Sequence, residues 1–188
     1  MTYYNKSCSI KSRFPTYASR KEHQMKSLFA KMASFLLVVC AISAHAQQTL
    51  AYTILNARSE IVDSANITYR PNGYEVSTNS RTTIFNVTPI LVTIITPNFT
   101  MYMPIDGSYY HSRMGQWRRT TLSTSDGQNG YATMHYHSNT PLGRMYDQEI
   151  ILGGRLLGRT RTVIDQWNQI VWSIMTDSSG GTFHLLRN

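Results

Sequence analysis

Cysteine is nearly absent from this chain of 188 residues, in which it occurs only as Cys8 and Cys40. Residues 47–188 contain none, so a domain formed by them has no disulfide, no thiolate nucleophile and no thiolate metal ligand. Such a domain depends on its hydrophobic core for stability. Its length is sufficient, because a domain of about 150 residues buries roughly 70% of the surface that its unfolded chain exposes.

Lysine is also absent from residues 47–188, which excludes Schiff-base chemistry and a phosphate-loop lysine in that region. The region has 11 arginines against nine acidic residues, a net charge of +2, whereas residues 1–46 have seven basic residues against one acidic residue, a net charge of +6. The +8 of the whole chain therefore belongs mainly to its first part. Net charge gives no reason to expect nucleic-acid binding by residues 47–188.

Motifs of the common catalytic classes are missing as well. The sequence contains no HExxH, GxSxG or GxGxxG. The glycine-rich stretch 153–158 is followed by Arg159, where a phosphate loop requires lysine. We therefore expect a protein without catalytic activity, and we keep a hydrolase acting on cell-envelope material as an alternative, since two carboxylates would suffice for one.

A secretory signal peptide is present in residues 25–46. Two lysines precede a short apolar stretch at 35–42, and the sequence Ala-His-Ala ends at Ala46, where small residues occupy the two positions that signal peptidase recognises. The apolar stretch is much shorter than the roughly 20 residues that a membrane span needs. We expect cleavage near Ala46 and export of residues 47–188 to the periplasm or the extracellular space.

Two features near the signal peptide leave alternatives open. Residues 1–24 are basic and show no period, which indicates either a start codon assigned upstream of the true start at Met25 or a basic N-terminal extension. Cys40 permits a lipoprotein in which the chain is cleaved before this residue. Val39 is large for the position that precedes a lipidated cysteine, so we favour cleavage near Ala46.

Residues 47–188 have the sequence pattern of β-strands joined by turns. Short runs rich in Thr, Ile, Val and Tyr alternate with clusters of Gly, Asn, Asp and Pro. Residues 71–73, Pro-Asn-Gly, predict a hairpin turn. Residues 159–165, 169–177 and 182–188 predict three consecutive strands, and residues 89–97 predict a strand that is buried on both faces.

We expect about eight to ten short strands in a single all-β domain, with residues 141–154 as a short helix or loop. Their number favours one antiparallel β-barrel or a strongly curved sheet, with a two-sheet β-sandwich as the alternative. An outer-membrane barrel is less favoured, because its strands would be longer and more regular. In the strand at 169–177, we assign Ile170, Trp172 and Ile174 to the core face.

Two histidines stand two positions apart in the stretch MHYH, at His135 and His137. On a strand they point to one face, roughly 7 Å apart, while Met134 and Tyr136 point to the other. Two such imidazoles predict a zinc or copper site if a further ligand joins them. The candidates for that ligand, all distant in the sequence, are His111, Met114 and His184.

Met101 and Met103 add two thioether sulfurs, which favour copper(I). Each metal hypothesis has a simpler alternative. The histidines would then form the side of a strand that faces solvent or a wet lumen, and the methionines would fill gaps in the core.

Arginine residues predict a site for an anionic ligand. Arg159 and Arg161 share a strand face, and Arg118 lies on another strand. Such guanidinium groups bind carboxylate, sulfate or phosphate. Trp117 and Tyr110 lie near turns in the central region, and aromatic residues accompanied by arginine are common at the mouths of ligand-binding barrels.

The alternative for these arginines is cross-strand ion pairing. The available carboxylates include that of Asp165, on the predicted face of Arg159 and Arg161, together with those of Glu75, Asp147 and Glu149. We expect the exported domain to bind an apolar or anionic small molecule, or a partner in the cell envelope. Metal binding through His135 and His137 is the alternative.

Overall fold

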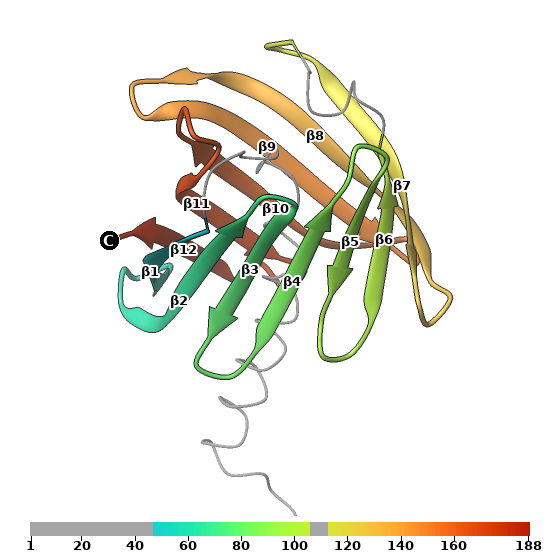
Figure 1. The fold of residues 1–188 in the computed structure, drawn as a ribbon, viewed down its shortest axis with the longest axis horizontal. Coiled ribbons are helices and arrows are strands. Elements are labelled where there is room, and N and C mark those ends of the chain that lie inside the picture. The colour runs from blue at the N-terminus through green and yellow to red at the C-terminus, as the bar shows by residue number, and fades with distance from the viewer. Residues whose placement is uncertain (1–46, 106–112) are drawn as a thin grey trace, which may run out of the picture.

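The computed structural model describes residues 47–105 and 113–188, and in these ranges the chain forms twelve antiparallel strands (Figure 1). Each strand pairs with its neighbours in the sequence, and β1 pairs with β12 to close a single barrel. The strands are β1 (Gln48–Asn56), β2 (Ile61–Arg70), β3 (Gly73–Thr78), β4 (Thr82–Val87), β5 (Leu91–Ile95), β6 (Thr100–Pro104), β7 (Trp117–Thr124), β8 (Asn129–Thr140), β9 (Gly143–Leu152), β10 (Arg155–Ile164), β11 (Ile170–Asp177) and β12 (Thr182–Arg187).

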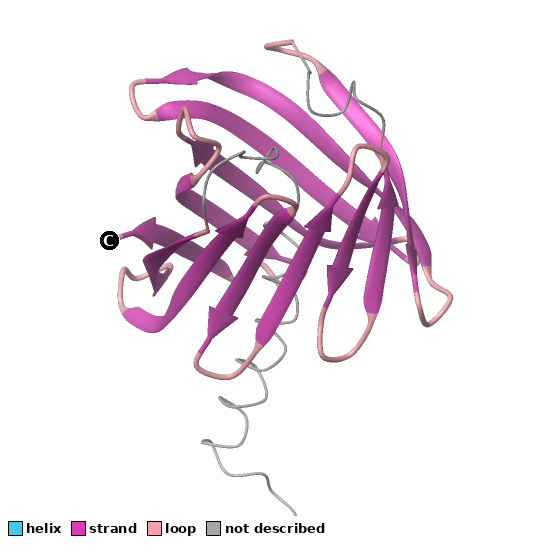
Figure 2. Cartoon of the chain, viewed as in Figure 1, coloured by secondary structure: helices cyan, strands magenta, loops and turns pink. Residues whose placement is uncertain are grey.

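The prediction of an all-β barrel is confirmed, and the number of strands is twelve rather than eight to ten. Figure 2 shows strands and loops in the part of the chain that is described. That part contains no helix with the length and apolar character that a membrane span requires. The predicted signal peptide, both cysteines, Tyr110 and His111 lie outside the described residues.

The prediction of a helix or loop at 141–154 is wrong, because these residues form most of the β8–β9 turn and strand β9. Side chains of β9 alternate between the two faces of the barrel wall. Tyr146, Gln148 and Ile150 are buried, while Asp147 and Glu149 lie on the outer face. A glutamine in the core and two carboxylates outside weakened the apolar alternation that a strand prediction requires.

The inner face of the barrel carries the hydrophobic core. Met101 and Met103 are fully buried there, which confirms their prediction as core residues. The hydroxyl of Tyr52 donates a hydrogen bond of 2.7 Å to the Ile170 carbonyl, and the Ile170 amide donates one of 3.0 Å to the Tyr69 hydroxyl. These bonds connect β1 and β2 to the start of β11 across the barrel interior.

A β-bulge overturns the prediction for the faces of β11. Ile170 is buried, but the register against β10 shifts between Val163 and Ile164, so that Trp172 pairs with Val163. Beyond this shift, Ser173 and Met175 are buried, and Trp172 and Ile174 lie half-buried on the outer face. One extra residue reverses which side chains point inward, and the apolar pattern alone does not reveal it.

Strand β5 is buried on one face rather than on both. Val92 and Ile94 lie in the core, whereas Leu91 is half-buried and Ile95 is exposed. The prediction for residues 89–97 failed because only the inner face of the barrel wall is covered by other side chains. The outer face carries apolar residues here without burying them.

Candidate metal centre

A row of four side chains crosses strands β7 to β10 on the outer face of the barrel. The strand register places Trp117 opposite His135, His135 opposite Asp147, and Asp147 opposite Arg161. Their sequence neighbours Met134 and Tyr146 point inward and are buried. Directly paired residues on one face of a sheet have Cβ atoms about 4.5–5.5 Å apart, so the four side chains are close enough to interact.

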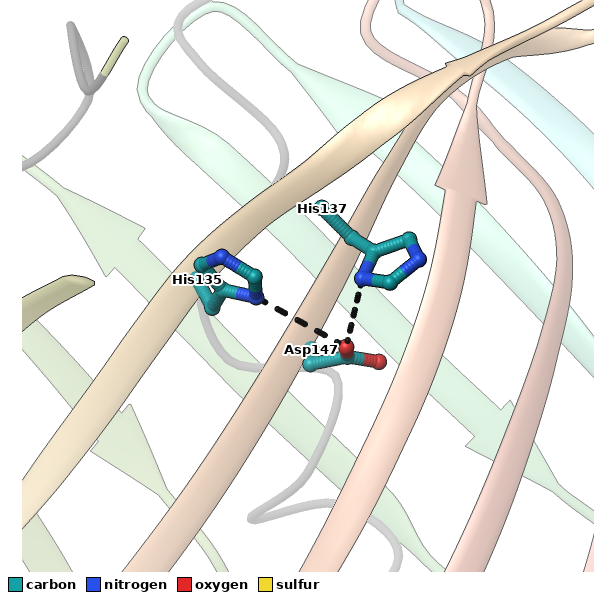
Figure 3. A group of neighbouring side chains, drawn as sticks. All are labelled: His135, His137 and Asp147. Carbon is teal, nitrogen blue, oxygen red and sulfur yellow. Dashed lines mark ion pairs between the residues drawn. The ribbon is translucent and has the colours of Figure 1, made fainter. Parts of the chain in front are cut away.

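His137 joins this row because of a second β-bulge. Tyr136 pairs with Tyr146 and Ser138 pairs with Met145, which leaves His137 as the extra residue of β8. Bulges bend the strand and redirect side chains. The imidazole of His137 lies over Asp147, next to that of His135, although His137 has no partner of its own on β9 (Figure 3).

The donor atoms of His135, His137 and Asp147 converge. The Nδ1 atoms of His135 and His137 lie 3.9 Å and 3.5 Å from Asp147 Oδ2 (Figure 3). The two imidazole rings are nearly perpendicular, at 84°, with centroids 5.7 Å apart. One ligand atom from each residue lies within 4.8 Å of the other two, and within the described ranges this is the group of three His, Cys, Asp or Glu side chains that meets this distance.

Arg161 holds the carboxylate of Asp147 from the side opposite to the histidines. Its Nε donates a hydrogen bond of 2.7 Å to Oδ1, and its second bond, from a terminal nitrogen to Oδ2, is 3.1 Å long. This hydrogen bonding to Asp147 raises the pKa of Arg161 above its ordinary value. A two-point contact of this kind fixes the plane of the carboxylate, which leaves Oδ2 directed at the imidazoles.

Trp117 covers the other side of the site. Its ring is stacked on that of His135, with centroids 4.4 Å apart and an angle of 6° between the planes. The side chain of His135 is only 16% exposed, whereas that of His137 is 43% exposed. The stack restricts the orientation of His135, and the site opens to solvent at His137.

The other predicted ligand residues do not join this group. His184 lies on β12 opposite Ile174, Met114 precedes β7 and is exposed, and Met101 and Met103 are in the core. Asp147 completes the group instead. From the sequence, Asp147 was predicted only as a partner for arginine, because residues 141–154 were predicted as a short helix or loop and not as a strand adjacent to β8.

The predicted anion-binding residues are distributed over both faces of the wall. Arg159 and Arg161 do share the outer face, and each pairs with a carboxylate of β9: Arg159 Nε lies 2.7 Å from Glu149 Oε1. Arg118 is directed inward between Trp117 and Arg119, so the structure does not bring it together with the other two arginines.

Arg118 points inward, but its hydrogen-bonding groups are only partly satisfied. A terminal nitrogen donates a 3.1 Å bond to Gln116 Oε1, while its Nε is buried without an acceptor. No carboxylate of the described residues forms an ion pair with it. Its neighbours across β8 and β9 on the inner face are Met134 and Gln148.

Asp165 does not lie on the face of Arg159 and Arg161 as predicted. It follows the end of β10, accepts hydrogen bonds from the backbone amides of Trp167 and Gln169, and pairs with Arg187 at 2.7 Å. Its role is to shape the β10–β11 turn and to connect that turn to β12.

No known protein family matches the chain, and no curated protein sequence does. The function must therefore be inferred from the chemistry of the residues that the fold brings together.

Proposed function

We propose that the protein binds a divalent transition-metal ion, zinc or copper(II), through His135, His137 and Asp147. The observation that supports this proposal is the convergence of two imidazole nitrogens on one carboxylate oxygen, at 3.9 Å and 3.5 Å. Imidazole and carboxylate are common ligands of zinc, and imidazole also suits copper(II).

The spacing between each imidazole and the carboxylate fits a bound ion with small adjustments. Ligand atoms bound to tetrahedral zinc at 2.0–2.1 Å are about 3.3 Å apart. The separations between each Nδ1 and Asp147 Oδ2 exceed this value by well under 1 Å. Rotation of the exposed His137 side chain and a modest movement of His135 would supply that contraction.

Arg161 supports the carboxylate in the way that outer-shell residues support metal ligands. Its shorter bond goes to Oδ1, which the histidines do not contact, and its longer bond goes to Oδ2, which lies near both imidazoles. A metal ion bound at Oδ2 would break the longer hydrogen bond from Arg161 and leave the shorter one, to Oδ1, in place. The remaining contact holds the orientation of Asp147, a role whose loss typically weakens metal binding 10–100-fold.

Three protein ligands leave a fourth coordination position open. Structural zinc sites are closed by four protein ligands, whereas sites with three keep a position for water or another molecule. Because His137 is exposed, that position would face the solvent outside the barrel wall. We therefore propose an exchangeable site that handles metal in the compartment to which the signal peptide directs the protein.

Isothermal titration of the full chain with zinc and with copper(II) tests the proposal. We expect one equivalent to bind, and we expect His135→Ala to weaken the affinity at least roughly tenfold because one of three ligands is lost. His184→Ala is the matched control, since it removes a histidine on β12 outside the site. Equal affinities of the two variants would contradict the proposal.

A second candidate function is the binding of an anionic small molecule at Arg118. The buried Nε without an acceptor supports it, because a buried polar atom that lacks a hydrogen-bond partner is costly. Titration with decanoate, whose carboxylate would pair with Arg118 while its chain lies among apolar side chains, tests this candidate. Arg118→Gln should abolish binding and Arg119→Gln, on the outer face over Tyr131, should not. Equal binding by both variants would contradict it.

A further inference from the structure

The two ends of the barrel differ in their side chains. Because the strands alternate in direction, the connections that follow even-numbered strands lie at one end, and those that follow odd-numbered strands lie at the other. In Figure 1 the β4–β5 and β8–β9 turns lie along the upper edge of the barrel, and the β3–β4 and β5–β6 turns lie along the lower edge. The start of β1 and the end of β12 belong to the upper end.

Exposed apolar side chains gather at the upper end. Among the residues that the structure describes, nine large hydrophobic residues are exposed, and six of them lie in the connections or strand ends there, with exposures of 40–74%. We call these six residues the apolar rim: Ile90, Met114, Trp117, Leu142, Trp167 and Leu186. Ile61 and Ile95 lie toward the lower end, and Tyr102 lies on β6 between the two ends. The six rim residues come from five segments of the chain, with Met114 and Trp117 in the same one.

Positive charge accompanies the apolar rim. The upper connections together with adjoining strand ends, described as residues 70–73, 88–90, 113–117, 140–144, 165–169 and 186–188, include four arginines and one aspartate, a net side-chain charge of +3. The lower connections together with adjoining strand ends, residues 57–60, 79–81, 96–99, 125–128, 153–155 and 177–181, include three arginines and three acidic residues, a net charge of zero. The two ends of the barrel therefore differ in charge, and the net charge of the whole domain does not reveal this difference.

Arginine and apolar residues are also adjacent along the chain at this end. Arg113 precedes Met114, Arg144 follows Leu142 by two positions, and Arg187 follows Leu186. Arg144 donates a hydrogen bond to the Asn168 side chain, which places it beside the turn of Trp167. Neither Arg113 nor Arg144 has an ion-pair partner within the described ranges.

We propose that the apolar rim docks the protein on the surface of an anionic lipid bilayer. Protruding Trp, Leu, Ile and Met side chains would enter the boundary between headgroups and acyl chains, as the apolar groups of interfacial proteins do. Arg113 and Arg144, which have no ion-pair partner within the described ranges, would bind lipid phosphates, since guanidinium groups match phosphate geometry. The combination of scattered apolar groups with excess positive charge favours this occupant over a second copy of the chain, whose own rim would carry the same charge.

This inference is independent of the proposed metal site. It uses the six exposed residues and the charge of the connections, and only Trp117 is common to both. A protein exported to the cell envelope would thereby hold its metal site close to a membrane surface, because Trp117 lies in the rim and is stacked on His135.

Co-sedimentation of the full chain with vesicles tests the proposal. Vesicles of equal parts phosphatidylcholine and phosphatidylglycerol are compared with vesicles of phosphatidylcholine alone. We expect the anionic vesicles to bind more protein. We expect Leu142→Ser combined with Trp167→Ser to weaken that binding roughly tenfold, because two inserted apolar groups are lost. Arg144→Gln should weaken it by roughly fivefold, the effect of one basic residue at an anionic surface.

The matched control is Ile61→Ser, which removes an exposed apolar residue at the lower end of the barrel. The native protein and all the variants retain residues 1–46, so any vesicle binding by that segment is the same in each of them. Equal loss of binding in the control and in the rim variant would overturn the proposal. Sedimentation equilibrium without vesicles tests whether a second copy of the chain binds the apolar rim instead. A dimer that forms with the native protein and with Ile61→Ser, but not with the rim variant, would show that it does and would overturn the proposal.

Discussion

His137 lies 3.5 Å from the carboxylate of Asp147, closer than His135 at 3.9 Å, although His135 is the residue that pairs with Asp147 in the strand register. The β-bulge in β8 produces this arrangement, since the extra residue places two imidazoles over one carboxylate. A regular strand would place His137 opposite Met145, two residues before Asp147 on β9, instead. The proposed metal site therefore depends on an irregularity in the sheet.

Asp147→Asn should weaken zinc binding at least roughly tenfold, because the amide has no negative charge and its oxygen is a weaker ligand. Glu149→Gln is the matched control, since Glu149 is the neighbouring outward carboxylate of β9 and also pairs with an arginine. Both variants lose one surface ion pair, which contributes about 0–1 kcal/mol to the free energy of unfolding. Isothermal titration and chemical denaturation of both variants separate the loss of a ligand from a loss of stability.

Trp117 should report the occupancy of the site. Its ring is stacked on His135 at 4.4 Å, so copper(II) bound to that imidazole would quench its fluorescence. We expect copper(II) to quench part of the emission of the native protein. The Trp117→Phe variant should lose this quenching, although Trp167 and Trp172 still emit. Quenching that persists in the variant would place the bound copper elsewhere.

Gly143→Ala should destabilise the protein strongly. A Cβ atom at this position would lie 1.8 Å from the Ile164 carbonyl oxygen, and the φ angle of 146° is one that side chains rarely adopt. We expect a loss of about 2 kcal/mol or more in the free energy of unfolding, measured by urea denaturation. Gly154→Ala is the control, because its φ of 74° also disfavours a side chain but no atom lies within 4 Å of the added Cβ. A similar loss in both variants would show that backbone conformation, and not the close approach of β9 to β10, requires the glycine.

Tyr146 should make the protein sensitive to alkaline pH. Burial raises the pKa of its phenol above the ordinary value of 10.0, so the phenol remains neutral in the folded protein at pH values where it ionises in the unfolded chain. Its contribution to stability is therefore complete below about pH 10 and is lost as the pH rises through the folded-state pKa. Tyr146→Phe should flatten the decline of the urea midpoint above about pH 10. Tyr102→Phe, which removes an exposed phenol from β6, should leave that decline unchanged.

The barrel was predictable because most of its strands alternate apolar and polar residues and end at recognisable turns. The hairpin at residues 71–72 and the last three strands were found in this way. Strand β9 was missed because Gln148 occupies a core position, where its side chain is buried beside Thr160. A polar residue in the core interrupts the alternation of apolar and polar residues by which a half-buried strand is predicted.

The candidate site was predicted in part. The shared face of His135 and His137 follows from their spacing on a strand, but the identity of Asp147 as the third ligand depends on the pairing of β8 with β9. Register between strands is set by turns and bulges, and neither bulge, in β8 or in β11, leaves a distinct mark in the composition. For the same reason the core face of β11 was assigned wrongly beyond Ile170.

The pairing of β1 with β12 distinguishes one seam of the barrel from all the others. Every other strand pair joins neighbours in the sequence, whereas contacts at this seam connect residues such as Tyr52 and Arg187. Closing a loop of that length costs about 2 kcal/mol more in chain entropy than closing a short hairpin. Eleven local hairpins can therefore assemble first as an open, curved sheet, and the formation of this seam becomes the late, slow step of folding. The same seam is where the native barrel should open first, and its amide protons should exchange with solvent before those of the β8–β9 hairpin.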